Sequence, residues 1–150
     1  MPTTSASIEL TTAVPEDFEE LLALRVEAMR ESLQRIGRFD PVRARERFRA
    51  GFSAAYTRHI ECAGQRVGFV VVKPHADCLL LDHLYIHPDV QGQGIGAAVL
   101  ARVIEEADLN ARPVRVGALR ESGSNRFYLR NGFVLVEQGE FDNYYLRTGQ

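Results

Sequence analysis

The chain has 150 residues, of which 45% are hydrophobic and 25% charged, as expected for one folded domain with a full core. Its net charge of −2 at pH 7 gives no electrostatic basis for binding nucleic acid or an anionic membrane. No apolar run is long enough to cross a bilayer, and the polar N-terminus lacks the apolar stretch of a signal peptide. We therefore expect a single domain over residues 1–150, located in the cytoplasm.

The cysteines and histidines show no site of their own. Cys62 and Cys78 lie in or beside apolar strand patterns, which is typical of buried, reduced thiols. No histidine stands at a recognisable spacing from either cysteine, so a catalytic thiol is the less favoured interpretation. The four histidines also lack metal-ligand spacing with cysteine or carboxylate, and we expect no metal.

The first third of the chain predicts a strand and two helices. Residues 8–12 alternate in polarity, and from Pro15 apolar residues recur at helical spacing until about Gly37. Asp40 followed by Pro41 predicts the start of a second helix, which extends to about residue 50. We interpret the four arginines of this helix as a solvated face, with a site for an acidic substrate as the alternative.

The middle of the chain predicts four strands and one helix. Residues 56–62 and 66–72 flank a short turn and predict a β-hairpin, followed by a strand over residues 78–86. A helix begins at about Gly94, and the next strand covers residues 114–118. This strand–helix–strand order predicts a parallel pair of strands.

The C-terminal part predicts a short helix and two strands. Ser122 is positioned to cap a helix that continues to Arg130, and the pair Asn131–Gly132 ends it. Residues 133–136 and 141–146 are the last two strands. The predicted order of elements is therefore β-α-α-β-β-β-α-β-α-β-β.

A glycine-rich loop joins the strand at residues 78–86 to the helix that follows. Gly92, Gly94 and Gly96 lack a Cβ atom, so the backbone can turn tightly and a ligand can approach it closely. The first amides of the helix have no intrahelical partner and lie at the positive end of the helix dipole. Together these features predict an anion site, most naturally for phosphate, against the alternative of a turn that binds nothing.

Two common phosphate-binding patterns fit this loop poorly. A Walker A loop needs Lys-Ser/Thr after its last glycine, but Gly96 is followed by Ala97 and Ala98. The loose Rossmann pattern from Gly92 to Ala97 needs an acidic residue at the end of the next strand. The strand over residues 113–118 ends without one.

Two motifs instead resemble those of the GNAT N-acetyltransferase superfamily. The sequence Gln91-x-x-Gly94-x-Gly96, preceded by Leu84-Tyr-Ile-His-Pro88, resembles its acyl-CoA loop. The segment Ser124-Asn-Arg-Phe-Tyr-Leu-Arg-Asn-Gly-Phe133 is similar to its late helix, which ends in Tyr-x-x-x-Gly-Phe. Many members carry Asn seven residues before that tyrosine, where this chain has Glu121, and Asn125 is the candidate to replace its polar role.

The resemblance implies a fold, an activity and a set of site residues. The fold is α/β (α+β): a mixed, mostly antiparallel seven-stranded sheet with about four helices, whose fourth and fifth strands run parallel and splay apart. The activity is transfer of an acetyl group from acetyl-CoA to a primary amine of a small molecule or peptide, by direct attack in a ternary complex. Pantetheine would pair with backbone groups of the central strand, and pyrophosphate would sit on loop amides. The cofactor-binding residues implied are Leu84, Tyr85, Ile86, Gln91, Gly92, Gln93, Gly94, Ile95, Gly96, Ala97 and Asn125.

The chemistry needs a proton acceptor for the amine and a proton donor for the leaving thiolate. Tyr128 matches the superfamily's general acid, with a packed core ring as the alternative. Asp82 matches an acidic position that faces the acceptor, with a hydrogen-bonded structural carboxylate as the alternative. His83 titrates in the right range, but a histidine inside an apolar strand is more often structural, and we favour that interpretation.

The acceptor is the least constrained feature. Acidic and aromatic side chains favour a cationic amine or an exposed amino terminus. Three arginines instead favour a carboxylate, which would make an amino acid the acceptor. The alternative function is a non-catalytic acyl-CoA-binding regulatory module. A Rossmann-type nucleotide binder is the third candidate function. The sequence does not decide between a monomer and a homodimer. The acidic and aromatic set is Asp82, Glu31, Glu140, Asp142, Tyr144 and Tyr145, and the arginines are Arg25, Arg30 and Arg38.

Overall fold

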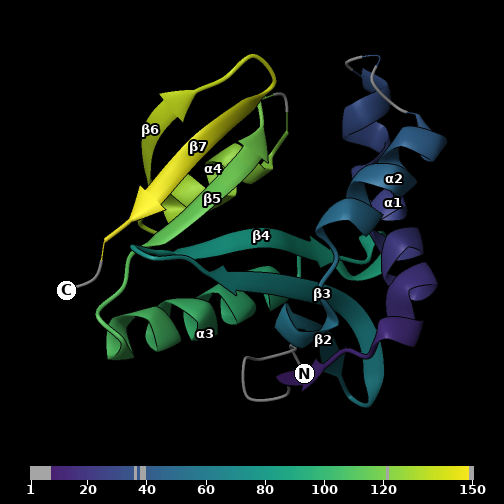
Figure 1. The fold of residues 1–150 in the computed structure, drawn as a ribbon, viewed down its shortest axis with the longest axis horizontal. Coiled ribbons are helices and arrows are strands. Elements are labelled where there is room, and N and C mark those ends of the chain that lie inside the picture. The colour runs from purple at the N-terminus through teal and green to yellow at the C-terminus, as the bar shows by residue number, and fades with distance from the viewer. Residues whose placement is uncertain (1–7, 36, 38–39, 121, 149–150) are drawn as a thin grey trace. The chain divides into compact units, whose positions relative to one another are not determined.

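The computed structural model describes residues 8–35, 37, 40–120 and 122–148. The side chain of Glu31, together with Arg38 and Glu121, falls outside the described residues. Figure 1 shows the elements in chain order. They are β1 (Ile8–Thr12), α1 (Phe18–Arg35), α2 (Pro41–Gly51), β2 (Thr57–Cys62), β3 (Gln65–Pro74), β4 (Leu79–Ile86), α3 (Ile95–Leu109), β5 (Val114–Leu119), α4 (Ser124–Arg130), β6 (Val134–Gln138) and β7 (Asp142–Arg147), with 3-10 turns at Pro15–Asp17, Ala54–Tyr56 and Pro88–Val90.

The seven strands form one mixed sheet in the order β1-β2-β3-β4-β5-β7-β6. The β4–β5 pair is parallel, and its ladder joins Leu79–Leu81 to Val114–Val116. The pairs β1–β2, β2–β3, β5–β7 and β6–β7 are antiparallel. This arrangement confirms the predicted fold class, including the parallel fourth and fifth strands.

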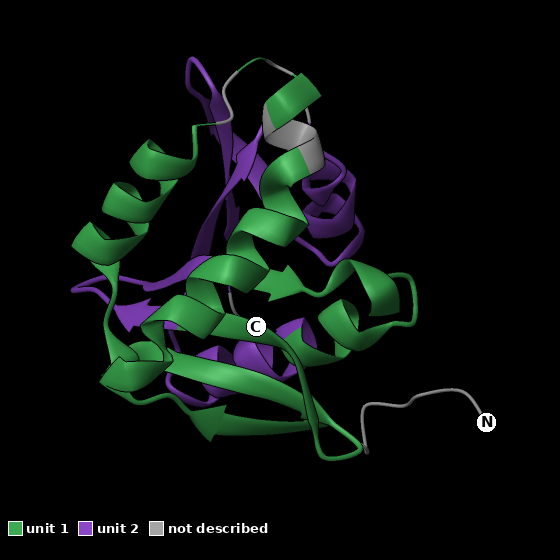
Figure 2. Ribbon diagram, turned by 90° about the vertical axis from the view of Figure 1, so that its right-hand side faces the viewer, with its two compact units in different colours: residues 1–71, 83–99 green, residues 72–82, 100–150 purple. Residues whose placement is uncertain are grey.

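The chain divides into two compact units, coloured separately in Figure 2. The first unit contains residues 1–71 and 83–99, and the second contains residues 72–82 and 100–150. The boundaries cut through β3, β4 and α3, so these three elements contribute to both units. A single domain over residues 1–150 stays a prediction.

The first unit is built around an aromatic cluster between its helices and its strands. Phe18 at the start of α1 stacks on Phe48 of α2, with ring centroids 5.5 Å apart, and Phe48 lies 5.9 Å from Phe69 of β3. All three are buried. Asp40 caps α2 as predicted, since its carboxylate accepts a hydrogen bond of 3.2 Å from the Arg43 amide.

The second unit is a sheet covered by the later part of α3 and by α4. Val103 and Ala107 of α3 are fully buried, as is Val114 of β5. Arg147 of β7 donates two hydrogen bonds to the Asp108 carboxylate, at 2.9 and 3.3 Å, and so ties the end of α3 to the sheet. None of the helices in the described part of the chain combines the length and apolar character of a membrane span.

The predicted cap of α4 is wrong. The helix begins after Gly123, which makes no side-chain cap hydrogen bond, and not after Ser122. The Ser122 hydroxyl instead donates to the Leu119 carbonyl at 2.8 Å. A serine can hydrogen-bond to several nearby backbone groups. Here its side chain stabilises the turn at the end of β5, and the helix begins one residue later than predicted.

Candidate functional site

The loop between β4 and α3 has the backbone geometry that its glycines predicted. Gly92 and Gly94 have φ angles of 80° and 82°, in the left-handed region that other residues rarely adopt. The first hydrogen bond of α3 runs from the Ala98 amide to the Gly94 carbonyl, at 3.1 Å. The amides of residues 95–97 therefore precede the helical ladder, where a helix N-terminus offers donors to an anion.

Side-chain and backbone bonds hold this loop to the end of β4. Gln91 Nε2 donates to the Ile86 carbonyl at 2.9 Å, and the His87 amide donates to the Val67 carbonyl of β3 at 2.7 Å. The His87 ring accepts a bond of 3.1 Å from the Asp89 amide through Nδ1. The side chain of Gln91, predicted as a cofactor residue, thus fixes the loop, while Gln91 to Gly94 stay exposed.

Gly68 of β3 meets a spatial requirement beside Tyr85 that the sequence did not reveal. A Cβ built on it would lie 2.2 Å from the Tyr85 carbonyl oxygen of β4, a distance no real side chain tolerates. The close approach of the two strands at Tyr85 therefore requires glycine. The need for glycine is visible only in the folded structure, because the sequence around Gly68 does not distinguish it from an ordinary strand glycine.

His83 and Tyr85 of β4 lie in the aromatic cluster of the first unit. The His83 ring lies 5.4 Å from Phe48, and the Tyr85 ring lies 5.5 Å from Phe69. His83 Nδ1 and Tyr85 Oη are 3.3 Å apart. This packing agrees with a structural role for His83.

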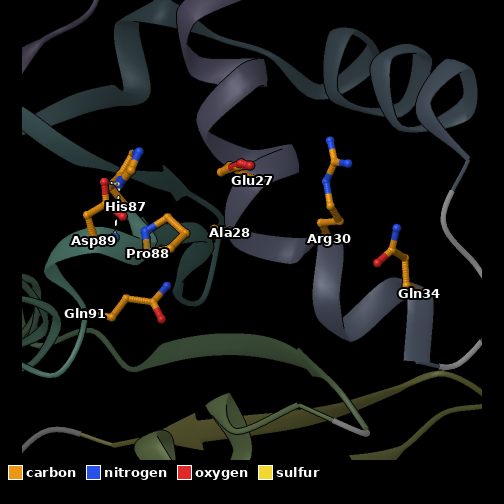
Figure 3. Close-up of a pocket in the computed structure, with 8 residues that line it drawn as sticks. All are labelled: Glu27, Ala28, Arg30, Gln34, His87, Pro88, Asp89 and Gln91. Atoms are coloured by element: carbon orange, nitrogen blue, oxygen red, sulfur yellow. Dashed lines mark hydrogen bonds and ion pairs between the residues drawn. The ribbon is translucent and has the colours of Figure 1, made fainter.

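The Arg25 side chain of α1 extends over Tyr85, with its Cζ atom 5.9 Å from the ring centroid. Its Nε atom is buried and has no hydrogen-bond partner among the described residues. Beside α1, a hollow of about 540 Å³ opens toward the β4–α3 loop (Figure 3). It is lined by Glu27, Ala28, Arg30, Gln34, His87, Pro88, Asp89 and Gln91.

The two predicted catalytic residues belong to the second unit. The Asp82 carboxylate forms an ion pair with Lys73 Nζ at 3.0 Å, and both side chains are partly buried. The Tyr128 side chain of α4 is 5% exposed. Its ring contacts Phe133 and Tyr145, at centroid distances of 5.5 and 6.2 Å.

Asn125 has protein partners for both ends of its amide. Its Nδ2 donates to the carbonyls of Leu119, Arg120 and Ser122, at 2.9, 3.2 and 2.8 Å. Its Oδ1 accepts from Tyr145 Oη at 2.7 Å and from Asn143 Nδ2 at 2.9 Å. The residue therefore fixes the β5–α4 loop and joins it to β7.

The remaining candidates differ in their exposure to solvent. Glu140 is exposed, whereas Tyr145 is 2% exposed, so its ring is not available to a surface ligand. Burial raises the pKa of the Cys78 thiol, and the neighbouring Asp77 adds to the rise, which opposes thiolate chemistry there. Among the described residues, no three His, Cys, Asp or Glu side chains gather into a group that could hold a metal ion.

Comparison with known proteins identifies the family. The family model "Acetyltransferase (GNAT) domain" matches residues 53–135, more than half of the 150-residue chain. A comparison with curated proteins gave no significant match.

Solved structures share the fold at low sequence identity. A PaiA N-acetyltransferase from Thermoplasma acidophilum in complex with coenzyme A is 19% identical, with 95% of this chain and 99% of that chain covered and a TM-score of 0.77. An acetyltransferase from Thermus thermophilus is 21% identical, with 99% of both chains covered and a TM-score of 0.73. A GCN5-related N-acetyltransferase from Rhodopseudomonas palustris is 18% identical, with 99% and 98% covered and a TM-score of 0.75. The motifs, the fold and the family match lead to one conclusion: this chain belongs to the GNAT acetyltransferase domain family.

Proposed function

We propose that this protein is an N-acetyltransferase that moves the acetyl group of acetyl-CoA to a primary amine of a small molecule or peptide, by direct attack in a ternary complex. The β4–α3 loop carries the proposal, because Gly92 and Gly94 adopt left-handed φ angles directly before a helix start. The coenzyme A in the Thermoplasma acidophilum structure supports an acyl-CoA ligand. A single domain and a cytoplasmic location are part of the same proposal.

The chain's own groups fit such a cofactor. Amides between Gln91 and Ala97 suit the pyrophosphate, and backbone groups of Leu84 and Tyr85 suit the amide-containing pantetheine arm. The Ile86 carbonyl already accepts from Gln91, so strand addition would use the remaining groups. When bound, acetyl-CoA supplies an activated thioester, and neither the loop nor the chemistry calls for a metal.

Tyr128 and Asp82 are assigned the proton transfers. In this proposal Tyr128 donates a proton to the departing sulfur. Asp82 binds the ammonium form of the acceptor or receives its proton through water, and Lys73 holds the carboxylate in place.

Substitution of Asp82 tests the second role. We expect Asp82→Asn to raise the acceptor KM, to lower kcat by about 10²-fold, and to leave acetyl-CoA affinity unchanged. Lys73→Met is the matched control, because it breaks the same ion pair but keeps the carboxylate. Equal losses of activity in the two variants would mean that Asp82 acts only through its ion pair with Lys73.

The whole proposal is tested by an acceptor panel. The protein is incubated with acetyl-CoA and polyamines, aminoglycosides, amino acids or peptides, in the presence of a chelator, while release of free thiol is measured. We expect thiol release that depends on one class of amine. Acetyl-CoA binding without any transfer would favour a non-catalytic regulatory module, and thermal stabilisation by NAD but not by acetyl-CoA would favour a nucleotide binder.

A further inference from the structure

We propose that Arg25 binds a carboxylate of the acceptor, so that the preferred acceptor is an amino acid and not a simple amine or a peptide amino terminus. This inference rests on the acetyl transfer proposed above and names its substrate class. It uses only residues of the first unit, which contains α1, the later part of β4 and the β4–α3 loop.

Arg25 has the surroundings of a ligand-binding arginine. Its Cζ atom lies 5.9 Å from the Tyr85 ring centroid, a cation–π contact that leaves the edge of the guanidinium plane for hydrogen bonds. Its buried Nε has no hydrogen-bond partner among the described residues, and a buried donor is unfavourable when it has no partner. A carboxylate that reaches the two terminal nitrogens would accept two parallel hydrogen bonds, in the bidentate geometry that the planar guanidinium favours.

The position of Arg25 links this carboxylate to the reaction. Tyr85 belongs to the stretch of β4 whose backbone is proposed to hold the cofactor's arm near the thioester. In an α-amino acid, one carbon atom separates the amino group from the carboxylate. A carboxylate held over Tyr85 therefore places the amino group beside the strand that presents the thioester, as required for direct attack.

The hollow beside α1 offers space for the amino acid's side chain. Its first lining residue on α1, Glu27, stands two positions after Arg25, and its first lining residue of the loop, His87, stands two positions after Tyr85. Arg30 and Gln34 extend from one side, and His87 and Asp89 from the other (Figure 3). Its volume of about 540 Å³ lies within the usual range for small-molecule sites.

The cationic alternative loses its main support. Recognition of a polyamine needs several uncompensated carboxylates, whereas the charge of Asp82 is offset by Lys73 at 3.0 Å, which leaves Asp82 suited at most to one ammonium group. Tyr145, another member of the acidic and aromatic set, is buried. The observed contacts therefore favour the arginine.

The test compares matched acceptors in the full chain with acetyl-CoA. Each amino acid is assayed beside its decarboxylated amine and its methyl ester, which keep the amino group but remove the negative charge. For the wild-type protein we expect kcat/KM to be roughly 10- to 100-fold higher for the amino acid, as expected for a charged hydrogen bond. Arg25→Gln should abolish this preference, and Arg25→Lys should restore part of it, since lysine keeps the charge but lacks the planar fork.

Arg47→Gln is the matched control, because Arg47 is an exposed arginine of the neighbouring helix α2. It should leave the preference intact, and none of the variants should change the KM for acetyl-CoA. If Arg25→Gln does not fold, the wild-type comparison and Arg25→Lys still decide the question.

Three results would overturn the inference. Equal kcat/KM values for amino acid and decarboxylated amine in the wild type would exclude carboxylate recognition. A preference that survives in Arg25→Gln would assign it to another residue. Transfer only to polyamines or peptides would refute the amino acid acceptor while leaving acetyl transfer intact, whereas no transfer to any amine would refute both.

Discussion

Two loops of this protein each lead from a strand to a helix, and they use their polar groups in opposite ways. The β4–α3 loop holds its ends with a few bonds but keeps its glycine backbone exposed and its helix-start amides outside the helical ladder. The β5–α4 loop turns inward, and Asn125 alone binds three of its carbonyls and two side chains of β7. The first loop is suited to binding an anion, and the second is suited to holding a helix in place.

The largest predicted effect is on kcat, and it concerns Tyr128 of α4, the helix that the second loop holds in place. We expect Tyr128→Phe to lower kcat by about 10²- to 10⁴-fold, because it removes the proposed acid but leaves the buried ring in place. Acetyl-CoA affinity should stay nearly unchanged, as measured by calorimetry. Tyr56→Phe, at an exposed tyrosine, controls for loss of a hydroxyl. If Tyr128→Phe turns over like the parent with a poor-leaving-group thioester, Tyr128 is only a core ring.

The first loop carries the next largest effect, on cofactor binding. A Cβ atom at Gly94 would meet no protein atom within 4 Å, so a side chain there would occupy only space open to a ligand. We expect Gly94→Val to weaken acetyl-CoA binding about 100-fold, equivalent to about 2.7 kcal/mol, through a clash with the pyrophosphate and a changed backbone.

Gly64 in the β2–β3 turn provides the matched control for backbone strain. Its φ of 81° is close to the 82° of Gly94, and it too has no atom within 4 Å of a built Cβ. Gly64→Val should therefore cost a similar stability, about 1–2 kcal/mol, while leaving acetyl-CoA affinity intact. A folded Gly94→Val variant that binds like the parent would remove the loop from the cofactor site.

The contrast between the loops also explains what the sequence could predict. Gly92 and Gly94 were found because glycine is required by local backbone geometry, which a short motif expresses directly. The order of elements along the chain followed from periodicity, and the parallel β4–β5 pair followed from the strand–helix–strand rule. Ser122 was misassigned because α4 begins one residue later, after Gly123, and the sequence does not rank two neighbouring helix starts.

Contacts between distant residues could not be predicted in this way. The ion pair of Asp82 with Lys73, and the placement of Arg25 over Tyr85, each depend on side chains that only the folded chain brings together. The close approach of β3 to Tyr85 is likewise visible only in space, although its cause is a single glycine at position 68. The sequence could predict the chemistry of the Asp82 and Arg25 side chains, but not the residues that contact them.

The smallest predicted effect on activity concerns Asn125, and it tests whether this residue holds the loop or binds the cofactor. Its amide makes five hydrogen bonds to protein groups, so Asn125→Ala should lower the free energy of unfolding by about 1–3 kcal/mol, measured by urea denaturation. If Asn125 only holds the loop, kcat should fall by less than about tenfold, since α4 keeps its packing, and acetyl-CoA affinity should not change.

The sequence-based expectation that Asn125 contacts the cofactor predicts a different result. In that case acetyl-CoA affinity would fall in Asn125→Ala, while Tyr145→Phe, which removes the hydroxyl that donates to Asn125 Oδ1, would leave it unchanged. A double-mutant cycle of these two substitutions measures their coupling in stability. Coupling in stability without loss of affinity would place Asn125 in the scaffold of the second loop, whereas loss of affinity alone would mean that both loops bind the cofactor and that the contrast between them is wrong.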